Sequence, residues 1–257
     1  MKISVCIDMM YSYCDFYDRF REAATDGIKT VEFWKWSNKN LDRVCSCLKE
    51  NGQQISIFNL DSRDETLSYD LSRGILNDGR VSEFLQALEE SIPVYRKLDA
   101  KAMIVLIGEH KPYCEENVFR CLAAAKPVLE AEKVNLIVEP LNAMDRVGYC
   151  MPYAMPVLSL IEKLDSPHIK MLYDLYHQSM TGDLDMKEVR RNIERIGHFH
   201  VADAPGRHEP GTGTVEYGRI LREINELSFD GFIGLEYRAT KRDGETYGFL
   251  KEVGYGL

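Results

Sequence analysis

The chain has 257 residues, of which 45% are hydrophobic, and its 32 basic and 41 acidic side chains give a formal net charge of −9. This length and apolar fraction suit one sizeable domain, because α/β barrels commonly reach this size as a single unit. The acidic surface disfavours nucleic acid as a partner, since it would repel a phosphate backbone.

Membrane and secretory signals are missing from the sequence. No apolar stretch approaches the roughly 18 residues of a membrane span, and residues 1–5 do not begin the long apolar core of a signal peptide. The seven cysteines are odd in number and form no C-x-x-C pair, which is typical of reduced thiols in a cytosolic protein. We therefore expect a cytoplasmic protein without a membrane partner.

Short apolar runs alternate with longer amphipathic stretches, and this pattern predicts parallel strands joined by crossover helices. The predicted strands, in chain order, are Ile3–Asp8, Thr30–Trp34, Gln54–Leu60, Ala102–Gly108, Asn135–Glu139, Ile169–Tyr173, His198–Ala202 and Phe232–Tyr237. The predicted helices are Phe16–Ala24, Leu41–Asn51, Arg80–Leu98, Cys114–Glu132, Ala154–Lys163, Met186–Arg195 and Glu216–Leu227, with a short one near Tyr247–Val253.

Eight such units predict one α/β domain over residues 1–257, a (β/α)8 or TIM barrel, because right-handed crossovers leave few other arrangements. An open doubly wound sheet is the alternative. That fold usually has a glycine-rich turn after its first strand, whereas residues 8–13 here read Asp-Met-Met-Tyr-Ser-Tyr, without G-x-G-x-x-G.

Polar side chains end the last four predicted strands, at the barrel face where active sites lie. Side chains alternate along a strand, so Glu139, Asp174, His200 and Glu236 are expected on the inward face at one height. A single strand-end acid is more often a helix cap or a surface ion pair. Four such groups in register are harder to explain in that way, and buried carboxylates so close would repel one another without a cation, so we predict one divalent metal ion. The oxygen-rich ligand set favours Mg²⁺, Mn²⁺ or Co²⁺, and Zn²⁺ is also compatible.

Other residues near this face allow alternative interpretations. His198 shares the inward face with His200, and we expect it to be a buried, hydrogen-bonded residue one layer deeper. Arg207 lies in the Gly- and Pro-rich loop of residues 203–213. Its guanidinium could grip a substrate carboxylate, or it could form a surface pair with Glu209. Trp34 and Trp36 could line the pocket or pack elsewhere.

Four segments of the sequence resemble the hydroxypyruvate isomerase family, within the larger xylose-isomerase-like barrel superfamily. The superfamily also includes ketose 3-epimerases and the endonuclease IV type of DNA-repair enzyme. The resemblance extends over nearly the whole chain and includes Phe58-Asn59-Leu60. Its most specific segments are Glu139-Pro140-Leu141-Asn142, Tyr173-Asp174-Leu175-Tyr176-His177, the run from Ala202 to Gly213, and Gly234-Leu235-Glu236-Tyr237.

The resemblance implies roles for seven residues. Glu139 and Glu236 would be both metal ligands and the pair that handles protons, and Asp174 and His200 would complete the metal shell. His177, just past strand six where a loop can bend it back, would hold substrate oxygens together with Arg207. Asp145 lies where related epimerases have a second acid that contacts the substrate. The family often has Gln at the position of His200, whereas ketose epimerases have His, and this departure leaves the substrate open.

The predicted activity is isomerisation of a small hydroxy-carbonyl compound through an enediolate, with a carboxylate moving the proton. Hydroxypyruvate, going to tartronate semialdehyde, or a 2-oxo-tetronate fits a substrate-binding arginine, and a homo-oligomer is compatible. A ketose 3-epimerase is the alternative. An endonuclease IV-like phosphodiesterase is a remote alternative. It needs further His and Asp ligands for additional metal ions, and the chain has only six histidines. Of these, His110 is an isolated candidate for such a ligand. A non-catalytic sugar-acid sensor has no DNA-binding segment or docking tail to support it.

Overall fold

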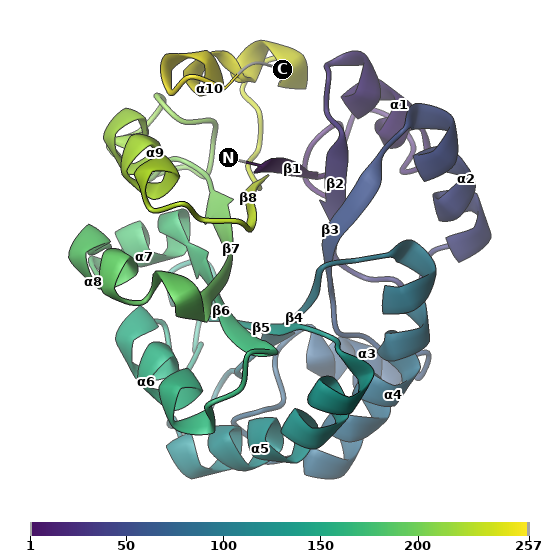
Figure 1. Ribbon diagram of the computed structural model, residues 1–257, viewed down its shortest axis with the longest axis vertical. Helices are drawn as coiled ribbons and strands as arrows, with labels where there is room; N and C mark the ends of the chain where they lie inside the picture. The colour runs from purple at the N-terminus through teal and green to yellow at the C-terminus, as the bar shows by residue number, and fades with distance from the viewer. Residues whose placement is uncertain (1, 256–257) are drawn as a thin grey trace.

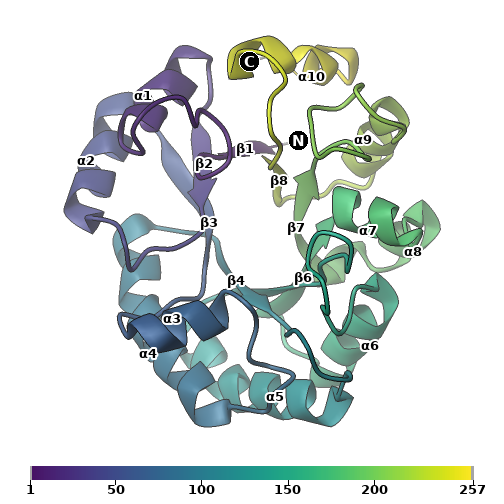
Figure 2. The same ribbon diagram turned by 180° about the vertical axis from the view of Figure 1, so that it is seen from behind.

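Eight parallel strands close into a barrel in which each strand pairs with its neighbour in the chain and β8 pairs with β1. The structure is a computed structural model that describes residues 2–255; Met1 and residues 256–257, included in the predicted domain, lie outside the described residues. Helices form an outer ring around the strands (Figure 1), and the same ring is seen from behind in Figure 2. The predicted (β/α)8 barrel is confirmed.

The strands are short and almost wholly buried. They are β1 (Lys2–Cys6), β2 (Thr30–Phe33), β3 (Gln54–Asn59), β4 (Ala102–Leu106), β5 (Leu136–Glu139), β6 (Ile169–Asp174), β7 (Ile196–Val201) and β8 (Phe232–Leu235). The helices are α1 (Asp18–Thr25), α2 (Leu41–Asn51), α3 (Glu65–Leu71), α4 (Val81–Leu98), α5 (Glu115–Glu132), α6 (Ala154–Leu164), α7 (Leu175–Thr181), α8 (Met186–Arg191), α9 (Tyr217–Glu226) and α10 (Gly248–Glu252). Two 3-10 turns, η1 (Ile193–Arg195) and η2 (Asp243–Thr246), complete the set.

Local side-chain chemistry sets several helix ends. Asn40 begins α2 by accepting a hydrogen bond from the backbone N–H of Arg43 at 3.0 Å, and Asp64 begins α3 in the same way. Such caps satisfy amides that have no partner within the helix. Gly52 ends α2 at a φ of 61°, a left-handed conformation that glycine adopts without a steric penalty.

The structure differs from the predicted elements in three places. Helix α3 was not predicted, and the predicted helix Met186–Arg195 divides at Asn192 into α8 and η1. His177, predicted to lie in a loop, lies instead in the first turn of α7. The reason is Asp174, whose carboxylate caps α7 and starts the helix directly at the end of β6.

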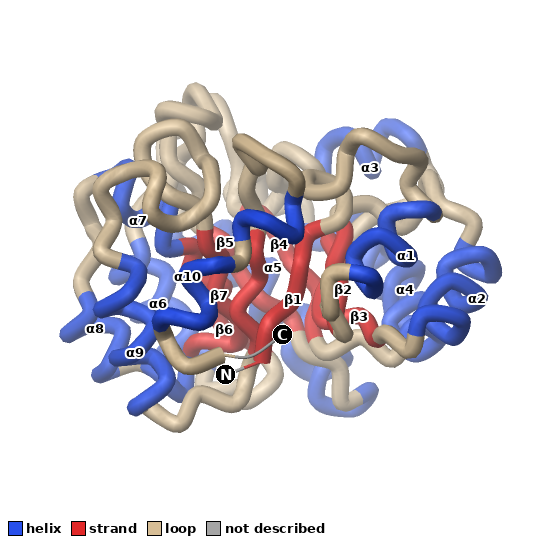
Figure 3. Tube along the Cα trace, turned by 90° about the horizontal axis from the view of Figure 1, so that it is seen from above, coloured by secondary structure: helices blue, strands red, loops and turns tan. Residues whose placement is uncertain are grey.

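Longer loops gather beyond one end of the strands, opposite the end where β1 begins (Figure 3). They follow the carboxyl ends of the strands, where the polar side chains project. None of the helices formed by residues 2–255 is both long and apolar enough to cross a lipid bilayer.

Candidate metal centre and active-site cavity

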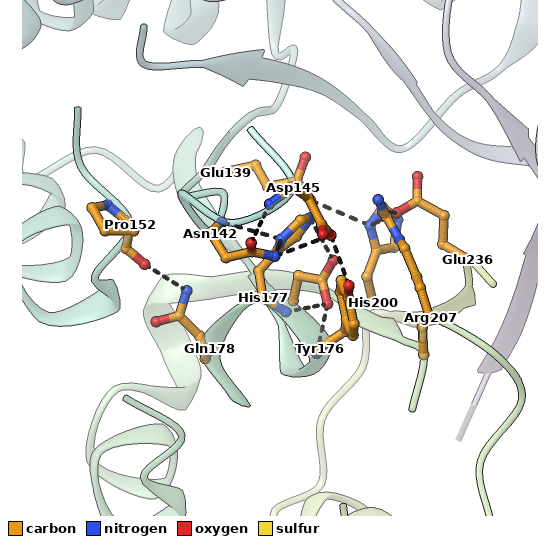
Figure 4. A network of polar contacts seen from close by, with 12 residues as sticks. Glu139, Asn142, Asp145, Pro152, Tyr176, His177, Gln178, His200, Arg207 and Glu236 are labelled. Atoms are coloured by element: carbon orange, nitrogen blue, oxygen red, sulfur yellow. Dashed lines mark hydrogen bonds and ion pairs between the residues drawn. The ribbon is translucent and has the colours of Figure 1, made fainter. Parts of the chain in front are cut away.

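Four side chains from consecutive strands meet at the carboxyl end of the barrel. Glu139, Asp174, His200 and Glu236 each offer one ligand atom, and these atoms lie within 4.8 Å of one another. All four residues are buried. The strand register aligns them, because Asp174 pairs with His200, which in turn pairs with Gly234 two residues before Glu236. Figure 4 shows Glu139 and Glu236 on either side of His200.

A fifth residue fixes the orientation of the His200 ring. Nε2 of His200 lies 2.8 Å from Oε1 of Glu32, so the ring donates its Nε2–H to that carboxylate. Nδ1 is buried without a hydrogen-bond partner and lies 3.5 Å from Oε1 of Glu139 and from Oε2 of Glu236. When the ring is neutral, Nδ1 is therefore the unprotonated nitrogen and faces the carboxylates, which is how a histidine held by a second carboxylate presents itself to a metal.

Glu32 lies in a polar layer inside the barrel, below the four-residue cluster. Its Oε2 is 3.2 Å from Nε2 of His198 and accepts a hydrogen bond from Oγ of Ser56 at 3.0 Å. Ser56 is in turn 2.5 Å from Oγ of Ser4. His198 is accordingly buried one layer deeper than His200 and close to Glu32, but its Nε2 forms no hydrogen bond there, unlike the hydrogen-bonded residue that was expected.

Gly234 makes this layer sterically feasible. A Cβ atom at this position would lie 2.6 Å from Oε1 of Glu32 and 2.7 Å from Nε2 of His198. Real Cβ atoms essentially never show contacts this short. The glycine in β8 thus leaves the space that the Glu32–histidine contacts occupy.

Burial and neighbouring charges set different pKa values for the carboxyl groups. Burial raises the pKa of Glu139, and it raises the pKa of Asp174 to about 7. Burial also acts on Glu236, but the charges of Arg207 and His200 outweigh it and lower its pKa. Burial would lower the pKa of His200, yet the charges of Glu236 and Glu32 hold it well above its usual value.

These residues fit a divalent cation. The crowded carboxylates favour added positive charge, and the unpartnered Nδ1 of His200 is a nitrogen ligand already directed at them. Three carboxylates and one imidazole match hard or borderline divalent metals. Glu32, His198 and His200 also lie close together, but the hydrogen bond from His200 to Glu32 identifies Glu32 as the outer partner of the histidine.

His177 presents a defined donor to the space beside the cluster. Its Nδ1 accepts from the backbone N–H of Asn142 at 3.1 Å and lies 2.6 Å from the side-chain amide of Asn142, so the proton is on Nε2. Burial lowers the pKa of His177 well below its usual value, which keeps the ring neutral. Its Nε2–H, 3.4 Å from Oδ2 of Asp174, can donate to a substrate oxygen.

Asp145 lies behind this histidine, not at the cavity wall. Its Oδ2 accepts from the Tyr176 hydroxyl at 2.7 Å and from the Asn142 amide at 3.2 Å, and it is absent from the cavity lining. The contacts seen in Figure 4 join Asp145 to His177 through Asn142.

Arg207 lies over the site in a loop that is held together by hydrogen bonds to Asp203. Asp203, fully buried, accepts from the backbone N–H groups of Ala204, Val215 and Gly211 at 2.9, 3.1 and 2.7 Å. Nη2 of Arg207 pairs with Oε2 of Glu236, and Nε of Arg207 is buried without a partner.

A surface pair between Arg207 and Glu209 does not form. Glu209 accepts instead from the Thr240 backbone and hydroxyl, at 3.0 and 2.5 Å. Arg207 is therefore directed into the site.

A cavity of about 320 Å³ opens beside the cluster. Its lining is shared between the metal-facing side and the loops that follow the first half of the barrel: Asp8, Trp34, Lys35, Asn38, Lys39, Asn59, Ser72, Ile104, Leu106, Glu139, Leu141, Arg146, His177, Arg207 and Glu236. A larger cavity, of about 680 Å³, lies at the opposite end of the barrel, where Lys2, Gln54 and Phe232 are placed. The smaller cavity is the one lined by Glu139 and Glu236 of the cluster.

Sequence reasoning missed Glu32, which could have been found as a lone acid between Val31 and Phe33 in an apolar strand. Trp34, for which two placements were left open, lines the cavity. It donates from Nε1 to Oε1 of Glu236 at 2.8 Å, a contact for which the sequence carries no signal. Trp36 packs in the core and donates to Ser91.

Two further histidines to which the sequence gave no role, His110 and His208, lie away from the cluster. His110 lies 3.4 Å from Glu109. Nδ1 of His208 lies 2.6 Å from the carbonyl oxygen of Arg238. Neither belongs to the group of potential metal ligands.

Comparisons of sequence and of structure both find proteins similar to this chain. The sequence model of the family described as xylose isomerase-like TIM barrel matches residues 20–253. The chain is 29% identical to hydroxypyruvate isomerase of Escherichia coli, over 93% of each chain. It is also 29% identical to 2-oxo-tetronate isomerase of Cupriavidus necator, over 95% of each. A crystal structure from Brucella melitensis, titled AP endonuclease, family 2, superposes with a TM-score of 0.88 at 24% identity and covers 97% and 98% of the two chains.

Proposed function

Because the chain belongs to the xylose isomerase-like TIM barrel family, we propose that it is a metal-dependent isomerase of a small 2-oxo acid, of the hydroxypyruvate or 2-oxo-tetronate type. The observation that carries the proposal is the cluster of Glu139, Asp174, His200 and Glu236 within 4.8 Å, with the unpartnered Nδ1 of His200 directed into it. The names of the two bacterial relatives agree with that substrate class.

The four residues of the cluster would hold one divalent ion, Mg²⁺, Mn²⁺, Co²⁺ or Zn²⁺. Bound there, it would supply a Lewis acid that offsets negative charge developing on the substrate oxygens. Glu32 would keep His200 in the tautomer that leaves Nδ1 free, which is the usual task of the outer partner of a metal-binding histidine.

The two glutamates would move the proton. The pKa of Glu236 is lowered, so its carboxylate is ionised at neutral pH and can accept the carbon-bound proton. The pKa of Glu139 is raised by burial, so this group more readily carries a proton to return. Opposed pKa shifts in neighbouring carboxyl groups are typical of acid–base pairs.

Arg207 and His177 would orient the substrate. Arg207, whose Nε–H has no partner, and His177, whose Nε2 carries the proton, both line the cavity and can donate to carbonyl or hydroxyl oxygens. Asp145 supports this arrangement from behind, through Asn142 and Tyr176. Trp34 and Arg207, bonded to the two oxygens of Glu236, fix the direction of its carboxylate.

The test is turnover of chelated enzyme reconstituted separately with Mg²⁺, Mn²⁺, Co²⁺ or Zn²⁺. Hydroxypyruvate, 2-oxo-tetronate and free ketoses are offered, and products are followed by NMR in D₂O. We expect metal-dependent isomerisation of a 2-oxo acid with solvent hydrogen in the product. Turnover that survives chelation would contradict the metal role. A preferred neutral ketose that is only epimerised would establish the alternative, a 3-epimerase.

A further inference from the structure

The cavity wall across from the cluster carries an excess of positive charge. The cluster lies on β5 to β8, whereas this wall comes from the loop after β2, the end of β3 and the loop after β5, packed against α3. We define the far wall as Lys35, Asn59 and Arg146, all of which line the cavity.

Lys35 contributes one uncompensated charge. Its Nζ donates to the carbonyl oxygen of Ser68 at 3.2 Å and to Oγ of Ser68 at 3.0 Å. No carboxylate of residues 2–255 forms an ion pair with it. Neighbouring Lys39 is different, because its Nζ is 3.2 Å from Oδ2 of Asp8 and is further bonded to the carbonyl oxygen of Lys35 at 2.8 Å. Lys39 is thus neutralised and Lys35 is not.

Arg146 belongs to a group of side chains that carries a second uncompensated positive charge. Oε1 of Glu109 lies 2.7 Å from Nη2 of Arg146, and Oε2 of Glu109 lies 2.7 Å from Nη2 of Arg73. Two guanidinium groups therefore share one carboxylate. Together with Lys35, the region has three cations against one anion, in a protein whose net charge is −9.

Two buried polar atoms of the far wall have no partner: Nε of Arg146, a donor, and Oδ1 of Asn59, an acceptor. A buried polar group without a partner is unfavourable, and most such groups in proteins are satisfied by the protein, by water or by a ligand. Both residues line the cavity. The two atoms themselves are covered from solvent, so a small shift of the side chains has to accompany their contact with a ligand.

Lys35 and Arg146 are also spaced to act together. Lys35 is tethered to Ser68, and Arg146 donates from Nη2 to the carbonyl oxygen of Ser72 at 2.6 Å. Ser68 and Ser72 are one turn apart at the C-terminal end of α3, a separation of roughly 6 Å. Two cations at this spacing can share one carboxylate between them.

We propose that the far wall binds the carboxylate of the substrate through Lys35 and Arg146, while Asn59 accepts a hydrogen bond from a substrate hydroxyl. The substrate class that follows is a 2-oxo sugar acid in preference to a neutral ketose. This inference rests on the proposed isomerase function and adds the site that selects for acids. A cavity of about 320 Å³ holds roughly ten waters at about 30 Å³ each, enough room for a four-carbon acid.

The test compares substrates that differ in the carboxylate. Lys35→Met and Arg146→Gln are assayed with hydroxypyruvate and with dihydroxyacetone, its neutral counterpart. We expect each variant to raise KM for hydroxypyruvate by about 10- to 100-fold, the loss of one charge-assisted hydrogen bond. We expect kcat to remain within about threefold, and any activity on dihydroxyacetone to be unchanged, because one positioning contact and no reacting group is lost.

Arg73→Gln is the matched control, because Arg73 pairs with the same Glu109 but does not line the cavity. It removes the same charge and should leave KM for the acid within about twofold, as expected for a screened charge outside the site. Equal losses for the acid and the neutral substrate would overturn the proposal. So would an effect of Arg73→Gln as large as that of Arg146→Gln, which would indicate only a long-range field.

A binding measurement separates failure of this inference from failure of the proposed function. Calorimetry with metal-loaded enzyme compares erythronate, an unreactive four-carbon acid, with neutral erythritol. If wild-type enzyme turns over none of the acids but binds erythronate more tightly than erythritol, and Lys35→Met abolishes that preference, the carboxylate site stands and the isomerase proposal fails. If wild-type enzyme isomerises acids yet shows no such preference, the far wall has been wrongly assigned.

Discussion

At the scale of the residue, Glu236 is the most constrained group of the site. Its two oxygens contact Trp34 and Arg207, and Oε2 is also 3.5 Å from Nδ1 of His200. These contacts hold the carboxylate in one direction and keep it ionised. A residue so fixed can accept a proton without first reorganising, which is what a general base requires.

Replacing Glu236 by Gln keeps the size of the side chain but removes both the base and a charged ligand. We expect turnover to fall by about 10³-fold or more, measured as kcat under metal saturation. Glu226→Gln, an exposed position on α9, is the control and should retain full activity. Activity of Glu236→Gln within tenfold of wild type would exclude this residue as the essential base.

Metal binding should depend on pH through Asp174. Its pKa is raised to about 7, mainly by burial, so the carboxyl group carries a proton below neutral pH and must release it to bind a cation. The affinity for metal should therefore rise with pH between 6 and 8, by up to about tenfold per pH unit for each proton released. Calorimetric titration at several pH values measures it, and an affinity that is flat across this range would contradict the assignment.

At the scale of the element, strand register and strand ends build the centre together. The pairing of β6, β7 and β8 places Asp174, His200 and Gly234 side by side. Asp174 then ends β6 and caps α7 through its Oδ1, at 2.8 Å from the backbone N–H of Tyr176. One carboxylate thereby starts the helix that carries His177 and leaves its Oδ2 toward the site.

Gly234→Ala tests whether β8 must leave room for the layer below the cluster. The added Cβ would meet Glu32 and His198 at 2.6 and 2.7 Å, so we expect loss of stability of about 1–3 kcal/mol and weaker metal binding as His200 is displaced. Thermal unfolding and metal titration measure these effects. At Gly218, in α9, a Cβ would meet only Arg222, at 3.6 Å, so Gly218→Ala should be neutral or slightly stabilising.

At the scale of the whole molecule, one half of the barrel holds the cluster, and loops from the other half complete the cavity. The metal ligands come from four neighbouring strands, so an ion that binds all four ties that side of the barrel together. Binding to the folded state alone stabilises it by mass action.

Removing the metal should therefore lower the melting temperature. A metal present at a hundredfold excess over its dissociation constant contributes about 2.7 kcal/mol, which for a chain of this size corresponds to roughly 5–10 °C. Differential scanning calorimetry with and without chelator measures the shift. Asp174→Asn should show a much smaller response, and a wild-type protein indifferent to chelation would argue against a bound ion.

Much of the fold could be predicted from the local pattern of the sequence. Short apolar runs predicted all eight strands, because parallel strands buried on both faces are nearly continuous in hydrophobic residues. The two-residue alternation of side chains brought Glu139, Asp174, His200 and Glu236 to one expected height, and the structure places them together. Helices α3 and α7 escaped prediction because they are short and depend on the caps Asp64 and Asp174 more than on periodicity.

Contacts between segments that are far apart in the sequence could not be predicted from local pattern. Glu32 and His200 are 168 residues apart, and Trp34 and Glu236 are 202 apart; closure of the barrel brings each pair together. The placement of Asp145 behind Asn142, and the hydrogen bonds of Lys35 and Arg146 to Ser68 and Ser72 at the end of α3, likewise follow from how the loops pack. Local propensity and side-chain alternation act over a few residues, whereas the partners, charges and free atoms of a side chain depend on which segments the folded barrel makes neighbours.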